Sequence, residues 1–265
     1  MNSQTDFYYI NDILVRKENE IGVLYVAAGI SYYENEWHQG VGGLFRSIDY
    51  GITFSQVLPG TGDNNMSYQP SDIELDENNN IWIGTRNNAW GEGGGTILKS
   101  NSGTLGSWIV MYNDDYADSE SSGKNRVELA VGSDNAVYAI GEGGSGTDDI
   151  SFFIKSENGG AGWISITIPL YDVPWNDENP HFTRGQADYD LILAVHPENA
   201  DVVIAGGIDL HRSTDGGENW TQISGWWLTP GDDNYAHADQ HNIIFRPENS
   251  NTVLFANDGG IHAPH

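Results

Sequence analysis

Cysteine is absent from the 265 residues, so neither a disulfide framework nor thiol chemistry is available to this chain. Basic residues are scarce: 11 Lys and Arg stand against 38 Asp and Glu, and the formal net charge is −27. This charge disfavours binding to nucleic acid or to an anionic membrane surface, because both carry negative phosphates. No apolar run approaches the roughly 18 residues that a transmembrane helix needs, so no membrane insertion is expected.

The first residues, Met1–Asp6, have neither a basic nor an apolar region, and we expect no signal peptide within this chain. The acidic surplus is consistent with a solvated surface, and it also permits bound Ca²⁺ or another divalent metal, because such ions prefer oxygen ligands. Acidic, Asn-rich loops occur at four places, none of which matches a known calcium motif: Asp63–Asn65, Asp114–Asp115, Asp148–Asp149 and Asp232–Asn234.

Glycine is plentiful, with 33 residues, and it separates short apolar segments of strand type. These segments come in pairs, each pair joined by a short polar turn such as Asn78–Asn80 or Pro197–Asn199. The predicted pairs are 12–15 with 23–27, 72–75 with 81–84, 127–131 with 137–140, 191–195 with 202–205, and 242–246 with 252–256. No helical segment is predicted, and the pattern indicates an all-β protein.

A distinctive turn follows the fourth pair, at Arg212–Trp220. Ser213 and Asp215 suit hydrogen bonds to the backbone of the turn, and Gly216 and Gly217 suit positive φ angles. Trp220 begins the next strand and is expected to cover the turn.

The same order of residue types occurs in three further places. Arg46–Phe54 matches it with Ser47, Asp49, Gly51 and Phe54, and Lys155–Trp163 matches it with Ser156, Asn158, Gly160 and Trp163. A degenerate copy lies at Lys99–Gly103, followed by Trp108. The serines are 47, 100, 156 and 213, a nearly even spacing that is typical of a repeat architecture.

This S-x-D-x-G-x-x-[FW] pattern resembles the Asp-box of BNR-type β-propellers, a superfamily that includes sialidases, sortilin-like receptors and xyloglucan-cleaving glycosidases. The resemblance implies four-stranded antiparallel blades, with the Asp-box turn between the third and fourth strands and away from the ligand face. The Asp-box residues are therefore expected to be structural: Ser47, Asp49, Gly51, Phe54, Ser156, Asn158, Gly160, Trp163, Ser213, Asp215, Gly217 and Trp220.

Counting repeats gives about four and a half blades in one partial β-propeller domain, 1–265. The approximate repeats are 7–60, 68–113, 124–170, 186–225 and 237–265, and the last is expected to stop before a third strand. Because propellers usually have four to eight blades, we favour a fragment of a larger propeller over an irregular closure. The remainder of such a chain, or a second copy of this one, is then a possible partner.

Tryptophans stand beside Asp, Asn and Glu in the loops between blades. Such residues suit sugar binding, because the ring stacks on the sugar and polar groups bond its hydroxyls. The alternative is that they pack between blades. The candidates for ligand contact are Trp37, Trp90, Trp175 and Trp226.

The segment Tyr235–His241 places His237, Asp239 and His241 at every second residue. In an extended strand all three side chains would share one face and could bind a divalent metal, or else form a hydrogen-bond cluster. Together with Asn257–Ile261, this segment resembles exported sortilin-like propellers of Bacteroidetes, many of which use type IX secretion.

Hydrolysis of a glycosidic bond needs two carboxyl groups on either side of the bond. Carboxylates at strand starts and loop tips are numerous: Asp12, Asp72, Asp188, Asp190, Asp239 and Asp258. Asp239 and Asp258 are the weak catalytic candidates, since Asp258–Gly260 loosely resembles xyloglucan-cleaving propellers. Sialidase chemistry is disfavoured, because the arginine pattern of those enzymes is lacking.

The sequence thus predicts an extracellular or cell-surface propeller that binds a polysaccharide or a protein. A glycoside hydrolase is the alternative, and a structural assembly protein is a third possibility, in which an exposed blade edge pairs with another chain.

Overall fold

The computed structural model describes residues 7, 9–29, 31–33, 36–38, 42–114, 125–143, 150–175, 181–247 and 249–262, with the backbone path alone for 31–33 and 36–38. The chain divides into two compact units, residues 1–129 and 130–265, which are described separately. Within the described ranges no helix is long and apolar enough to cross a membrane.

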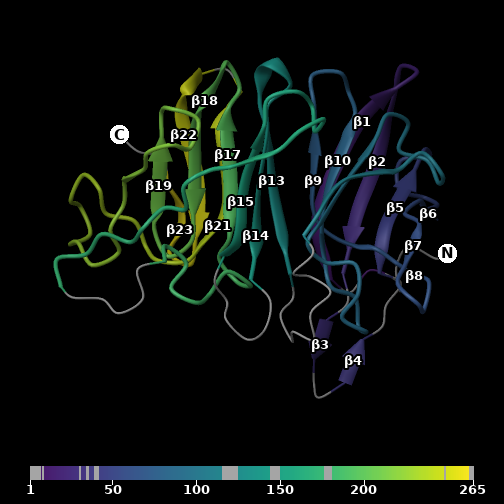
Figure 1. Ribbon diagram of the computed structural model, residues 1–265, viewed down its shortest axis with the longest axis horizontal. Helices are drawn as coiled ribbons and strands as arrows, with labels where there is room; N and C mark the ends of the chain where they lie inside the picture. The colour runs from purple at the N-terminus through teal and green to yellow at the C-terminus, as the bar shows by residue number, and fades with distance from the viewer. Residues whose placement is uncertain are drawn as a thin grey trace. The chain divides into compact units, whose positions relative to one another are not determined.

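The first unit contains two four-stranded antiparallel sheets (Figure 1), ordered β1-β2-β5-β6 and β12-β11-β10-β9. Two short hairpins, β3–β4 and β7–β8, lie outside these sheets. The strands are β1 (Ile10–Glu18), β2 (Ile21–Ala28), β3 (Ser31–Tyr33), β4 (Glu36–His38), β5 (Gly43–Ser47), β6 (Ser55–Gln56), β7 (Gly60–Thr61), β8 (Met66–Ser67), β9 (Gln69–Leu75), β10 (Ile81–Arg86), β11 (Thr96–Ser100) and β12 (Ile109–Asn113).

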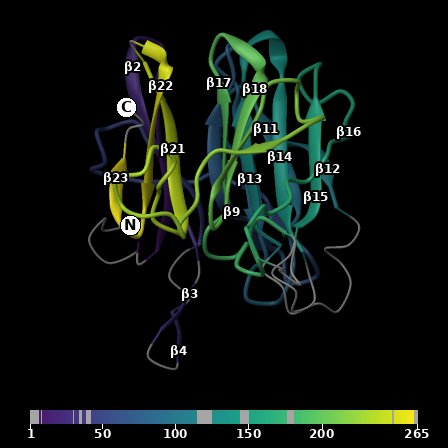
Figure 2. The ribbon, with the colours of Figure 1, turned by 90° about the vertical axis from the view of Figure 1, so that its left-hand side faces the viewer.

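The second unit contains the sheets β13-β14-β15-β16, β17-β18-β19-β20 and β21-β22-β23; strand β13 spans the division between the units. Strand β17 lies beside β14 and beside β21 (Figure 2). The elements are β13 (Val127–Val131), the 3-10 turn η2 (Ser133–Asn135), β14 (Val137–Glu142), β15 (Ile150–Ser156), β16 (Ile164–Ser165), β17 (Ile192–His196), β18 (Asn199–Gly206), β19 (Leu210–Ser213), β20 (Thr221–Gln222), β21 (Gln240–Arg246), β22 (Asn249–Asn257) and β23 (Gly260–His262).

The prediction of an all-β fold with four-stranded blades and one incomplete blade is confirmed. Four sheets have four strands, and the fifth has three among the described residues. One detail of the prediction was wrong, since the fifth repeat does reach a third strand, the short β23. The chain turns back after Asn257, so that Gly260 pairs with Asn257 and β23 pairs with β22. The hairpins β3–β4 and β7–β8 were also not predicted, since their strands are two or three residues long.

Three hairpin corners share one hydrogen-bond pattern. In the corner after β19, the Ser213 hydroxyl donates to Asp215 at 2.8 Å and accepts from the Gly217 amide at 2.9 Å, and Asp215 accepts from the Asn219 amide at 2.9 Å. The corners at Ser47 and Ser156 repeat these bonds. The fifth residue of each corner is glycine with φ between 83° and 92°, a region that side chains disfavour.

The degenerate corner after β11 differs because its Gly103 is one residue closer to the serine and its Trp108 is one residue further away. The Ser100 hydroxyl accepts from the Gly103 amide at 2.8 Å, three residues on rather than four, and Ser107 lies 2.5 Å from Ser100 Oγ.

Apolar side chains on facing sheets form the cores of the two units. In the first unit Tyr25, Leu44, Ile81 and Leu98 are fully buried together, with Trp108 packed at the margin. In the second unit Tyr138, Phe153, Leu193, Val203 and their neighbours form the core between β13–β16 and β17–β20. These side chains alternate along the strands, as the sequence pattern requires of sheets covered by neighbours.

Candidate ligand-binding face

Polar and aromatic side chains of the second unit gather at the strand ends opposite the hydrogen-bonded corners. Asp209 immediately precedes β19, whereas the corner at Ser213 follows it, so the two lie at opposite ends of one strand. The same end of the unit carries the loop 223–239 and the turn after β22. We call this end the loop face.

Asp209 is the buried carboxylate of the loop face, with no exposed surface. It accepts hydrogen bonds from the Ser224 hydroxyl at 2.9 Å, from the Trp226 amide at 3.1 Å and from Gln222 Nε2 at 3.4 Å. Burial raises the pKa of Asp209 to about 7, although these hydrogen bonds favour the charged form. A carboxyl group of this kind changes charge near neutral pH and is typical of functional sites.

An aromatic cluster adjoins Asp209. Trp226 Nε1 donates to the Tyr171 hydroxyl at 2.5 Å, and Trp227 packs edge-on against Tyr171 with 5.8 Å between centroids. Trp175 packs edge-on against both Trp226, at 6.3 Å, and Trp227, at 5.6 Å. Because Trp175 and Trp226 remain 43% and 40% exposed, the cluster presents indole surface to solvent.

Arg184 contacts the cluster, and His211 is buried on the strand that follows Asp209. The Arg184 guanidinium lies over the Tyr171 ring, 5.3 Å from its centroid, and burial followed by the charge of Asp209 raises the pKa of the Tyr171 phenol. His211 is buried against Phe182, and burial lowers the pKa of its imidazole to about 4, so it stays neutral.

A second polar group on the loop face joins Tyr189, His241 and Asp258. His241 Nε2 lies 2.7 Å from Asp258 Oδ1, and the Tyr189 hydroxyl donates to the same atom at 3.2 Å. The Tyr189 and His241 rings pack edge-on at 4.8 Å. The hydrogen bond from His241, with a smaller contribution from Tyr189, lowers the pKa of Asp258.

The expected shared face of His237, Asp239 and His241 is not formed. Asp239 has φ of 66°, and β21 begins only at Gln240, so the three side chains do not alternate along an extended strand. His237 Nδ1 lies 3.1 Å from the Ala238 carbonyl, while His241 pairs with Asp258. Among the described residues no group of three or more His, Cys, Asp or Glu side chains is arranged to hold a metal ion.

Asp239 nevertheless lies within the electrostatic reach of Asp258. Burial, followed by the negative charge of Asp258, raises the pKa of Asp239, whereas that of Asp258 is lowered. The two weak catalytic candidates thus have carboxyl groups that differ in acidity. Asp190 is also buried in this unit, and Asp188 is half-buried beside it.

The remaining tryptophan candidates belong to the first unit. Trp90 is 47% exposed in the turn 87–93, where its amide donates to Asn88 Oδ1. In the same turn the Glu92 carboxylate accepts a hydrogen bond from the Asp63 amide at 3.1 Å. The predicted acidic loop at Asp63–Asn65 is therefore bonded to this turn. Trp37 lies on β4, and its side chain is outside the described residues.

Of the other predicted calcium loops, the one at Asp232–Asn234 lies within the described residues. Asp232 Oδ2 accepts from the Thr229 amide at 2.9 Å, which closes its own turn. Asp115, Asp148 and Asp149 lie outside the described residues.

Carboxyl groups on the first strands of the sheets gather in the first unit. Asp12 accepts from the Ile73 amide at 3.1 Å, and Asp72 accepts from the Leu129 amide at 2.7 Å. Burial raises the pKa values of four carboxyl groups, that of Glu74 to about 8, and neighbouring negative charges add to the rise in all of them except Asp12. The four are Asp12, Asp72, Glu74 and Glu128.

Sequence reasoning missed Tyr171, Tyr189, Asp209 and Trp227 as members of the loop face. Trp227 stands next to a predicted candidate, and Asp209 sits in the Gly-rich turn before a predicted strand, which is a weak signal. Tyr171 and Tyr189 carry no motif, because their positions depend on loops that fold back from the neighbouring sheet.

No protein-family model matches this chain, and no curated protein matches its sequence. Solved structures do. A GH74 xyloglucanase from Xanthomonas campestris is 16% identical, with TM-score 0.56, over 99% of this chain and 46% of its own. The YCF48 protein from Cyanidioschyzon merolae is 14% identical, with TM-score 0.51, over 92% of this chain and 63% of its own. The fold is that of a β-propeller.

An extracellular domain of a hybrid two-component system from B. thetaiotaomicron is also similar, at 12% identity and TM-score 0.54 over 96% of this chain and 27% of its own. This chain therefore spans less than two thirds of the length of these propellers. At such low identity the similarity establishes the propeller fold and leaves the ligand to be inferred from the loop face.

Proposed function

We propose that this propeller is a binding module that holds a polysaccharide on the loop face of residues 130–265. The observation that carries the proposal is the cluster of Trp175, Trp226 and Trp227 beside Tyr171, with Asp209 hydrogen-bonded at its edge. Exposed indole rings stack on the apolar faces of sugars, and neighbouring carboxylates and amides accept or donate to the hydroxyls.

The negative charge of the chain restricts the kinds of polysaccharide that it is expected to bind. Asp209, Asp239 and Asp258 share the loop face, and the chain as a whole carries −27. Polysaccharides with uronic acid or sulfate groups would be repelled, because like charges near a binding site disfavour association. A neutral polysaccharide such as xyloglucan, the substrate named for one structural neighbour, is the first ligand to test.

Affinity electrophoresis or calorimetry with xyloglucan and with polygalacturonate tests this proposal. We expect binding to xyloglucan alone, and we expect Trp226→Ala and Trp175→Ala each to weaken it by about tenfold, as for aromatic contacts at a binding site. Trp90→Ala is the matched control, because Trp90 is equally exposed but lies in the other unit. Equal binding by all three variants would refute the proposed site.

A glycoside hydrolase is the second candidate, and one observation favours it. The charge of Asp258 contributes to the raised pKa of Asp239, whereas the pKa of Asp258 is itself lowered, and such a difference is typical of acid and base roles. The expected result is release of reducing ends from xyloglucan that Asp239→Asn and Asp258→Asn each abolish. Binding without release of reducing ends would leave only the binding module.

We also infer that the corners at Ser47, Ser156 and Ser213 are Asp-boxes with a structural role, and that the protein is exported to the cell surface. Their common hydrogen bonds support the first inference. The Bacteroidetes-like sequence and the acidic composition support the second. Detection of the protein in the surface or culture fraction of its cell would test export.

A further inference from the structure

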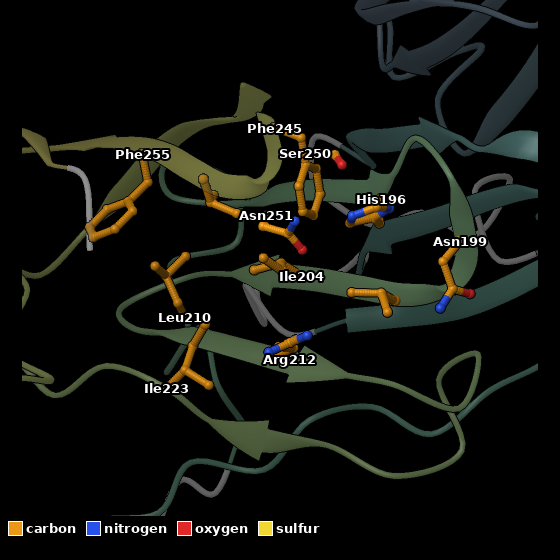
Figure 3. A pocket seen from close by; sticks show the side chains of 12 residues that line it. His196, Asn199, Ile204, Leu210, Arg212, Ile223, Phe245, Ser250, Asn251 and Phe255 are labelled. Atoms are coloured by element: carbon orange, nitrogen blue, oxygen red, sulfur yellow. The ribbon is translucent and has the colours of Figure 1, made fainter. Parts of the chain in front are cut away.

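The loop that carries the exposed Trp226 is attached to the second unit at the point where strand pairing ends. The Ile223 amide donates to the Leu210 carbonyl at 2.8 Å, which extends the pairing of β19 with β20 by one residue. Both side chains line the cavity between the sheets β17–β20 and β21–β23 (Figure 3). Beyond Ile223 the chain leaves the sheet, and its next residues bond to the Asp209 carboxylate.

One oxygen of Asp209 holds the backbone of this loop. Asp209 Oδ1 accepts from the Ser224 hydroxyl at 2.9 Å and from the Trp226 amide at 3.1 Å. The Ser224 hydroxyl in turn accepts from the Leu210 amide at 2.8 Å, which ties the loop to β19. Because Asp209 is fully buried, water does not replace a hydrogen bond that is lost at this carboxylate.

The indole of Trp226 is held by the same carboxylate through Tyr171. Trp226 Nε1 donates to the Tyr171 hydroxyl at 2.5 Å, and this hydroxyl also hydrogen-bonds to Asp209. A phenol that donates its proton to a carboxylate keeps its oxygen free to accept from the indole. The backbone and the ring of Trp226 are therefore both oriented by one ionised group.

Protonation of Asp209 disturbs this arrangement. An ionised carboxylate offers about four acceptor positions, and a proton occupies one of them. The donors that converge on the two oxygens come from Ser224, Trp226, Gln222 and Tyr171. One of these groups therefore loses its acceptor when Asp209 is protonated. Burial raises the pKa of Asp209 to about 7, so the change occurs near neutral pH.

Other titratable and charged groups come from the segments packed against Asp209. The negative charge of Asp239 contributes to the raised pKa of Asp209, after burial. Burial lowers the pKa of His211 to about 4, so its imidazole stays neutral while Asp209 titrates. The remaining groups are Tyr171, whose phenol has a pKa raised by burial, Arg184 over the Tyr171 ring, and Asp172, whose amide donates to Gln222.

We propose that Asp209 is the positioning residue of the polysaccharide site, whose ionised carboxylate orients Trp226 and whose protonation releases the ring and weakens binding. This inference rests on the proposed function and adds a control by pH. Because the ionised form holds the ring in place, the affinity for a neutral polysaccharide is expected to rise as the pH passes upward through about 7.

Indole NMR of the full chain tests the positioning role without a ligand. The Trp226 Nε1 proton signal, identified by its absence in Trp226→Phe, is expected to shift with pH with a midpoint near 7. Asp209→Asn should remove this shift, because an amide does not titrate. Tyr171→Phe should also remove it, because the hydroxyl joins the ring to the carboxylate. Asp233→Asn is the matched control, exposed in the same loop, and should keep the shift.

Calorimetry with xyloglucan tests the consequence for binding. Wild-type affinity is expected to be about tenfold weaker at about pH 5.5 than at about pH 8, as for a lost hydrogen bond to a charged group. Asp209→Asn should bind weakly at both pH values, and Asp233→Asn should keep the wild-type difference. Asp239→Asn should lower the midpoint, because the charge of Asp239 contributes to the raised pKa of Asp209.

Two results would overturn the proposal. One is a Trp226 signal that shifts alike in the wild-type and Asp209→Asn chains, and the other is tight xyloglucan binding with the same affinity at both pH values. If xyloglucan does not bind at either pH, the proposed function fails. The indole titration then still decides whether Asp209 orients Trp226.

Discussion

Trp220 lies over Phe153 with 5.4 Å between the ring centroids and 29° between the ring planes, so a corner of one sheet covers the core of the sheet before it. The indole also donates to the Thr167 carbonyl at 2.7 Å. This contact joins successive sheets of the second unit at their corner ends, opposite the loop face.

Trp220→Ala is expected to lower the free energy of unfolding by about 2–4 kcal/mol, because it removes a large ring packed on the core and one hydrogen bond. Urea denaturation followed by circular dichroism would measure the loss. Trp90→Ala should change it by less than about 1 kcal/mol, as for other exposed positions. Similar losses in the two variants would show that Trp220 contributes no more than a surface residue.

Ser213→Ala is expected to lower the free energy of unfolding by about 1–3 kcal/mol, because the buried Gly217 amide loses its hydrogen-bond acceptor. Thr214→Ala is the matched control, since that side chain is exposed in the same corner. Amide hydrogen exchange provides a local readout: the Gly217 amide should exchange faster in the Ser213 variant only. Unchanged protection at Gly217 would contradict the role assigned to the serine.

The raised pKa values of Asp12, Asp72, Glu74 and Glu128 in the first unit indicate that the free energy of unfolding falls as the pH rises. The folded chain raises the pKa of Glu74 from 4.5 to about 8, through burial and then the charges of Asp12 and Glu128. Its protonated form is therefore favoured by folding, and its contribution to stability is fully present below pH 4.5 and lost as the pH approaches 8.

Glu74→Gln should accordingly reduce the difference in urea midpoint between about pH 5 and about pH 8, where the wild-type chain loses this contribution. The exposed Glu77→Gln variant should keep the wild-type difference. A pH dependence that Glu74→Gln leaves intact would assign the effect to the other carboxyl groups of the cluster.

Asp258→Asn is expected to lower the pKa of Asp239, because the charge of Asp258 is one of the causes that raise it. Carbon-detected NMR titration of the Asp239 carboxyl would measure the shift. Asp233→Asn is a suitable control at an exposed position of the preceding loop. An Asp239 titration that is the same in wild-type and Asp258→Asn chains would show that the two groups act independently.

The repeat of Ser47, Ser156 and Ser213 was enough to predict the blades, since each corner forms from residues within one short stretch. The strands before the corners were predictable for the same reason, from alternating apolar residues. The loop face was predicted only in part. Trp175 and Trp226 were predicted from the composition of their loops. Asp209 and Tyr171 were not predicted, because they bond to Trp226 from positions 17 and 55 residues earlier in the chain.

The alternation of His237, Asp239 and His241 was misleading because it presumed an extended chain. The positive φ of Asp239 turns the backbone before β21 begins, and His241 then pairs with Asp258, 17 residues further on. Spacing alone does not reveal such a turn, since aspartate tolerates both conformations.

The side chains of Ser213 and Asp215 form their hydrogen bonds with residues of the same corner, 213–219. The corner therefore depends little on the residues around it. The degenerate corner at Lys99–Trp108 could therefore be exchanged for the nine residues Arg46–Phe54 without redesigning the sheet around it. Such an exchange would leave the opposite ends of the strands unchanged. The corners and the loop-bearing strand ends could therefore be engineered independently of each other.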